Sequence, residues 1–151
     1  MGELKDRLQH DLTTSMKARD ELRTATLRMV LTAIGTQEVA GKAARTLSAD
    51  EELQVVTREA KKRREAAEAF RSGGADDRAE RELAEEEVLS AYLPAQLSDD
   101  ELTALVTEAV ASSGASGPSA MGAVMKAVGP QVAGRAEGGR VAAAVRAALT
   151  A

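Results

Sequence analysis

The sequence contains no cysteine and a single histidine, which removes most metal-binding and nucleophilic chemistry. Without cysteine there is no disulfide, iron–sulfur cluster, thiolate zinc site or cysteine nucleophile. His10 lies in a helical pattern marked by Leu4, Leu8 and Leu12, and the helical turn places it on the polar side. No second imidazole exists to complete a metal site or a catalytic dyad. We therefore interpret His10 as a solvated side chain and predict no metal and no cofactor.

Aromatic residues are nearly absent, with one phenylalanine (Phe70), one tyrosine (Tyr92) and no tryptophan. The core must therefore be built from leucine, valine, isoleucine, methionine and many alanines, whose small side chains permit close approach of helices. Modules that bind single-stranded nucleic acid stack bases on aromatic side chains, so the composition argues against that mode of recognition. Recognition of nucleic acid by shape or through phosphates is still open.

Long apolar runs and a charged leader with an apolar segment are also lacking. We therefore expect a cytoplasmic protein with no membrane partner. The net charge is −4, with 29% of residues charged, so the chain as a whole is not a polycation. Binding to nucleic acid would have to come from local basic patches.

The sequence that is present has a helical period almost throughout, and no strand pattern competes with it. Ser48 with Glu51, and Ser98 with Glu101, fit the capping box at a helix start. Gly114 is typical of a left-handed cap at a helix end. The sequence predicts an all-α protein with helices over residues 2–18, 20–39, 49–72, 77–91, 99–113, 118–128 and 138–149.

Pro94 marks the sharpest boundary, because proline blocks helix continuation and the charge density changes there. We expect two domains. Residues 1–95 form a four-helix, bundle-like domain, and residues 96–151 form a small three-helix tail domain. The tail is small enough to be only marginally stable alone.

Four charged residues fall on predicted apolar faces. Arg23 lies on the apolar face of 20–39 and Arg63 on that of 49–72, while Glu80 and Glu87 share the apolar side of 77–91. Because buried charges need partners, we interpret these four as structural ion pairs that fix the helix register. The other interpretation is a polar pocket. No nucleophile or base stands beside these residues, so we predict no catalytic residue.

The run of four bases at residues 61–64 is the most conspicuous motif. Successive residues on a helix point in different directions, so only Arg58, Lys61 and Lys62 share an outer face, with Glu65 among them. Interleaved carboxylates are typical of a solvated helix face. The alternative is a secondary basic face that binds phosphate.

The charges of the predicted tail segregate along the chain. Residues 93–117 carry acidic side chains and no base, and residues 118–151 carry mainly bases. Either the two halves neutralise one another between helices, or the basic half forms a surface that faces phosphate. The sequence leaves both open. The bases are Lys126, Arg135, Arg140 and Arg146.

Several short motifs become informative through their order and spacing. They are Met16-Lys-Ala-Arg-Asp20, Leu27-Arg-Met29, Lys61-Lys-Arg-Arg64, Tyr92-Leu-Pro94 with Gln96-Leu97, and Met121-Gly-x-Val-Met-Lys126 before Gly134-Arg135-Ala136. On these motifs the chain resembles the YqeY (GatB/YqeY-domain) family over essentially its whole length. This family shares its tail with the B subunit of the aspartyl/glutamyl-tRNA amidotransferase, which uses glutamine as amide donor.

The resemblance implies contact with tRNA. In the amidotransferase, catalysis belongs to other parts of the complex, while the helical and tail domains engage the tRNA. We therefore expect a non-catalytic, tRNA-binding accessory protein, with an aminoacyl-tRNA synthetase or an amidotransferase subunit as a further partner. The family label of carbon–nitrogen ligase activity with glutamine as amido-N-donor is interpreted as transferred from the larger enzyme. The alternative is a module that docks on a synthetase or amidotransferase without binding RNA.

Two positions depart from the family pattern. Glu137 stands where aspartate is usual, and Gly139 where lysine is frequent, which removes one phosphate contact next to Arg140. The expected nucleic-acid surface is still the basic half of the tail. Its selectivity would come from the shape of folded tRNA, because base stacking on aromatic side chains is not open to this chain.

Overall fold

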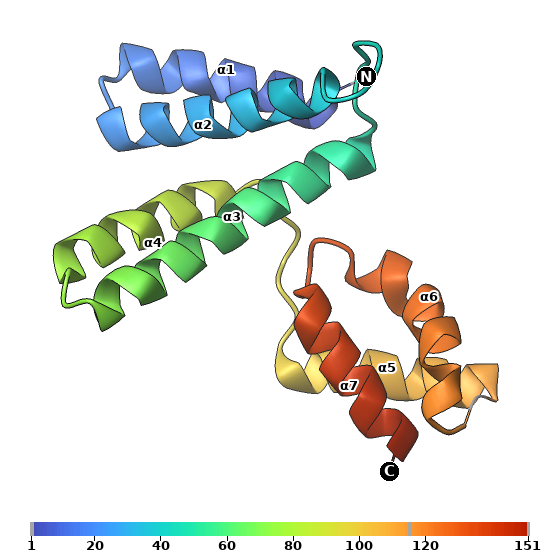
Figure 1. Ribbon diagram of the computed structural model, residues 1–151. Coiled ribbons are helices and arrows are strands. Elements are labelled where there is room, and N and C mark those ends of the chain that lie inside the picture. The colour runs from blue at the N-terminus through green and yellow to red at the C-terminus, as the bar shows by residue number, and fades with distance from the viewer. Residues whose placement is uncertain (1, 115, 151) are drawn as a thin grey trace. The chain divides into compact units, whose positions relative to one another are not determined.

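The computed structural model describes residues 2–114 and 116–150, and these residues form helices without strands (Figure 1). The all-α prediction is confirmed. The helices of the described residues are α1 (Glu3–Lys17), α2 (Glu21–Glu38), α3 (Ala49–Ser72), α4 (Asp76–Ser90), α5 (Asp99–Ser113), α6 (Met121–Val132) and α7 (Gly138–Thr150), with a short 3-10 helix (Pro118–Ala120) before α6.

Local signals set most helix ends. Both capping boxes form, with the Ser48 and Ser98 side chains each accepting from the backbone three residues on. Gly114 ends α5 at φ 66°, in the left-handed region. The predicted helix 118–128 is the exception, because its first residues form the 3-10 turn and α6 then continues past Pro130. Pro130 lies in the last turn of α6, where it removes a single backbone donor.

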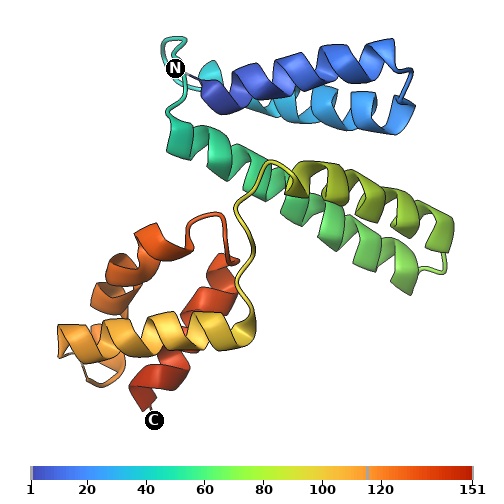
Figure 2. The ribbon, with the colours of Figure 1, turned by 180° about the vertical axis from the view of Figure 1, so that it is seen from behind.

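The chain divides into two compact units, Met1–Leu93 and Pro94–Ala151. In the first, α1 lies beside α2 and α3 beside α4, as both views show (Figures 1 and 2). Helix α2 packs against α3 and α4 as well. The buried cluster of this unit is Leu8, Leu27, Val30, Ile34, Leu47, Val55, Val56, Ala60, Leu89 and Tyr92.

Glu52 is a buried carboxylate at the start of α1. Burial raises the pKa of Glu52, and the backbone N–H of Lys5 donates to the carboxylate and opposes that rise. A Cβ at Gly2 would collide with Glu52 Oε2, so a larger residue there requires the Glu52 side chain to move. Helix α1 lacks a side-chain cap of its own at Gly2. The Glu52 carboxylate adds to the negative charge of Glu3 and Asp6 in the first turn of α1, which a helix start favours.

Tyr92 anchors the segment after α4, at the end of the first unit, through its hydroxyl and its ring. Its hydroxyl donates to Asp11 Oδ2 at 2.5 Å and accepts from Arg23 Nη2 at 3.2 Å. The Arg7 guanidinium lies 4.6 Å from the centre of the Tyr92 ring and donates to the Ala91 carbonyl. These contacts tie the segment after α4 to α1 and α2.

The second unit packs α5, α6 and α7 around a core rich in valine. Its buried residues are Leu97, Leu102, Val106, Val124, Val128, Val132, Val141, Val145 and Leu149. The segment before α5 belongs to this unit, because the Leu97 N–H donates to the Arg135 carbonyl and Gln96 Nε2 donates to the Gly134 carbonyl, both at 2.8 Å. The unit boundary after Leu93 thus lies slightly before the predicted one after residue 95.

The titration of Tyr92 tests its buried contacts, since it is the only tyrosine. Burial, followed by the hydrogen bond to Asp11, raises the pKa of Tyr92 to about 12 from an ordinary value of 10.0. The folded pKa is above the unfolded one, so the associated stability is present below pH ~10 and is lost as the pH rises towards 12. We expect tyrosinate absorbance to appear with a midpoint near 12 in native protein and near 10 in urea.

An Asp11→Asn variant provides the control, because it removes the negative charge beside the hydroxyl while keeping an acceptor. Its native midpoint should fall below that of the wild type. A wild-type midpoint that is the same with and without urea would contradict the buried geometry of Tyr92.

Candidate functional site

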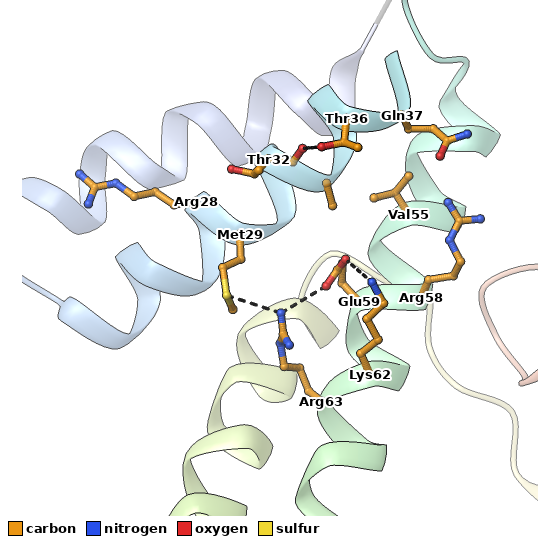
Figure 3. Close-up of a pocket in the computed structure, with 11 residues that line it drawn as sticks. Arg28, Met29, Thr32, Thr36, Gln37, Val55, Arg58, Glu59, Lys62 and Arg63 are labelled. Carbon is orange, nitrogen blue, oxygen red and sulfur yellow. Dashed lines mark hydrogen bonds and ion pairs between the residues drawn. The ribbon is translucent and has the colours of Figure 1, made fainter. Parts of the chain in front are cut away.

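A groove of about 570 Å³ opens between α2 and α3 in the first unit (Figure 3). The spacing of its residues explains why they meet: each set recurs every three to four positions and so lies along one face of its helix. We call this feature the α2–α3 groove. It is lined by Arg28, Met29, Thr32, Ala33, Thr36 and Gln37 of α2 and by Val55, Arg58, Glu59, Lys62 and Arg63 of α3.

Two arginines stand at opposite ends of the groove, with Met29, Thr32 and Val55 between them (Figure 3). Arg28 and Arg58 are both exposed. Within residues 2–114 and 116–150, no carboxylate lies within 4 Å of either guanidinium. Their positive charges are therefore available to an anion from outside.

Arg63, which lines the groove, is the centre of a network of ion pairs. Arg63 Nη2 donates to Glu59 Oε2 at 3.2 Å, and Arg63 Nε lies 3.5 Å from Glu85 Oε2 and 4.0 Å from Glu82 Oε2. Arg63 Nη2 also lies 3.6 Å from the Met29 sulfur. Only 16% of the Arg63 side chain is exposed. One guanidinium thus connects α3 to α4 and to α2.

The carboxylates of this network lie close to one another around Arg63. Burial raises the pKa of Glu85, and the neighbouring Glu82 raises it further, while Arg63 and Arg81 lower it. Glu59 is bound by Arg63 and also accepts from Lys62 Nζ at 3.2 Å. The one carboxylate that lines the groove is therefore already neutralised.

The structure corrects part of the predicted ion pairing. Arg63 and Arg23 do lie near carboxylates, and Arg23 is 3.8 Å from Asp11 Oδ2. Glu80 and Glu87, however, are exposed, and neither forms an ion pair within the part of the chain that is described. Their assignment as structural partners is wrong.

The reason is the phase of α4. Its buried positions are Ala79, Glu85 and Leu89, whereas the apolar residue Leu83 is 37% exposed. Helix α4 has too few apolar residues to define its inner face by pattern alone. Glu82 and Glu85 therefore occupy the places expected of Glu80 and Glu87.

The predicted outer basic face is divided by the structure. Arg58 and Lys62 line the α2–α3 groove, while Lys61 does not and lies 3.8 Å from Glu65. Arg28, which was not among the predicted site residues, joins them from α2. Its place in the Leu27-Arg-Met29 motif was the only available signal, and a motif does not show which helix faces another.

Two of the four bases predicted in the tail make internal contacts. Arg140 Nη2 lies 2.7 Å from Asp99 Oδ1 and donates to the Leu97 carbonyl at 3.0 Å. Arg135 Nε donates to the Ala95 carbonyl at 3.2 Å. These arginines hold the segment before α5, which agrees with neutralisation inside the tail.

The other two tail bases, Lys126 on α6 and Arg146 on α7, are exposed. No carboxylate lies within 4 Å of either among the residues with assigned positions. They stay candidates for phosphate contact. His10 is exposed on α1, and across the described chain no group of three or more histidine, acidic or cysteine side chains is arranged to hold a metal ion.

These features define an all-helical protein whose first unit carries a cationic groove and whose tail carries exposed bases. Within the described chain, none of the helices has the length and hydropathy of a membrane span. The chain matches the Yqey-like protein family over residues 5–149 and belongs to that family. The resemblance seen in the sequence is thereby confirmed. Among curated proteins, none matches this sequence.

The Arg63 network predicts a large difference between neighbouring arginines. Arg63→Gln would remove the buried cation shared by Glu59 and Glu85 and leave them only the more exposed Lys62 and Arg81, so the free energy of unfolding should fall by about 3 kcal/mol, the lower end for a broken buried pair. Arg64→Gln removes an exposed pair with Glu86 and should change it by less than about 1 kcal/mol. Urea unfolding at neutral pH measures both.

The loss for Arg63→Gln should shrink at acidic pH, because protonated carboxyls no longer need a cation. Equal losses for the Arg63 and Arg64 variants at neutral pH would contradict the proposed importance of the network.

Proposed function

We propose that this protein is a non-catalytic accessory protein that binds folded tRNA, with tRNA phosphates lying along the α2–α3 groove. The observation that supports this most directly is the pair of exposed arginines at the two ends of the groove, Arg28 and Arg58, neither of which has a carboxylate within 4 Å among the described residues. The Arg28 guanidinium lies towards α1, with Nη2 3.7 Å from the Met16 sulfur. Arginine forks match phosphate oxygens in geometry as well as charge.

The balance of charge favours a polyanion at this place. The chain carries a net charge of −4, so non-specific attraction to nucleic acid is weak and binding depends on a local patch. In the groove, Glu59 is already bound by Lys62 and Arg63, so it does not repel an incoming phosphate strongly. About three phosphate contacts would give a log–log salt slope of roughly −2 to −3.

The groove is suited to binding rather than to chemistry. A general acid or base needs a titratable group that is available to the substrate. Glu59, the acidic residue of the groove, is bound to two cations, and the other ionisable residues there are bases. Any carbon–nitrogen ligase activity with glutamine as amide donor therefore belongs to a larger tRNA-dependent amidotransferase system.

The tail adds a second set of contacts. Lys126 and Arg146 are exposed on α6 and α7 and serve as phosphate contacts, while Arg135 and Arg140 keep the segment before α5 in place. This assignment fits the resemblance of the tail to the amidotransferase B subunit. It also divides the four predicted bases into two contact residues and two positioning residues.

The test is a titration of folded tRNA and of duplex DNA of equal length at several salt concentrations. The groove variant is Arg28→Gln with Arg58→Gln and Lys62→Gln. A control with the same change in net charge is Lys17→Gln with Lys42→Gln and Arg71→Gln, all exposed residues outside the groove. We expect the groove variant to lose at least about tenfold in tRNA affinity and to have a shallower salt slope. The control should keep both.

Duplex DNA should bind more weakly than tRNA, because the shape of folded RNA provides the selectivity. Equal behaviour of the groove variant and the control would overturn the proposal. It would favour the alternative, in which the protein docks on a synthetase or an amidotransferase without binding RNA.

A further inference from the structure

We propose that the α2–α3 groove holds one unpaired nucleotide of the bound RNA, with its base over Met29 and Val55 and its phosphate at Arg58 and Lys62. This inference rests on the proposed function and adds a ligand class to the same site. It concerns what occupies the middle of the groove, which contact with phosphates alone does not explain.

The volume and the lining of the groove support a nucleotide. Small-molecule pockets commonly measure about 300–1,000 Å³ and combine an apolar floor with a few polar groups. The groove, at about 570 Å³, has Met29, Ala33 and Val55 between its charged ends. Met29 is 38% exposed, which leaves apolar surface uncovered at the centre of a cationic groove. A flat base covers such a surface while its phosphate meets the basic end.

Met29 can take the role that an aromatic platform has in other RNA-binding proteins. A thioether makes favourable contacts with aromatic rings, although methionine is ordinarily flexible. Here the Met29 sulfur lies 3.6 Å from Arg63 Nη2, as the dashed line in Figure 3 shows, and Arg63 is itself held by Glu59 and Glu85. The surface is therefore set in place before a ligand arrives.

The charges fix the direction of the nucleotide. Arg58 and Lys62 are one helical turn apart on α3, so both reach the same phosphate. Arg28 stands at the other end of the groove, with Nη2 3.7 Å from the Met16 sulfur, and takes a more distant phosphate of the strand (Figure 3). A free mononucleotide uses only the first of these contacts and binds more weakly than the RNA.

Methionine methyl signals give a direct test of this placement. Protein labelled at the methionine methyl groups is titrated with a nucleoside monophosphate and, separately, with inorganic phosphate. The aromatic base should shift the Met29 signal, while Met121 and Met125 of the tail serve as internal controls. Inorganic phosphate carries no ring and should leave the Met29 signal nearly unchanged. Equal shifts of Met29 with both ligands would overturn the proposal and indicate an anion site only.

Matched variants separate the two parts of the site. Arg58→Gln should weaken mononucleotide binding about tenfold, the loss of a charge-assisted hydrogen bond, whereas Arg71→Gln on the same helix should not. Met29→Ala should weaken tRNA binding by up to about tenfold, whereas Leu83→Ala, which alters an apolar residue of similar exposure outside the groove, should not. Equal effects within either pair would count against the nucleotide.

The same measurements distinguish this inference from the proposed function. If tRNA binds through Arg28, Arg58 and Lys62 but the Met29 signal stays unchanged with tRNA and mononucleotide, the groove contacts phosphates only and the inference is wrong. If mononucleotide shifts the Met29 signal while tRNA does not bind, the inference about the ligand stands and the proposed function is wrong.

Discussion

Arg63 is the side chain on which the arrangement of the first unit depends. A guanidinium that is only 16% exposed requires carboxylates around it, and they come from its own helix, at Glu59, and from α4, at Glu82 and Glu85. These contacts fix how α4 turns towards α3. Because Arg63 also touches Met29 of α2, the same group positions the floor of the groove.

The charge of the groove follows from that network. Arg63 and Lys62 both contact Glu59, and among the described residues no carboxylate lies within 4 Å of Arg28 or Arg58. The ion pairs of Glu59 therefore have a structural role and also leave the groove with a positive charge. From the sequence, ion pairing of Arg63 and a polar pocket are alternatives. In the structure, Arg63 lines the pocket and is paired at the same time.

The tail shows why segregated charge along a sequence does not by itself define a surface. Arg135 and Arg140 lie in the basic half, but both reach back to residues 95–99. Carbonyl groups and Asp99 satisfy them there. Lys126 and Arg146 lie on other helices and keep exposed charges. The distinction depends on contacts between residues about forty positions apart, such as Leu97 and Arg140.

The sequence by itself determined the helical class, most helix ends and the family, because capping boxes, glycine caps and the 3.6-residue period act over a few neighbouring residues. Only the tertiary structure decided which face of α4 points inward, since its few apolar residues left the choice to Arg63. The tertiary structure also joined Arg28 of α2 to Arg58 of α3 across one groove. The sequence shows which residues share one face of each helix, but which two faces lie against each other depends on how the helices pack.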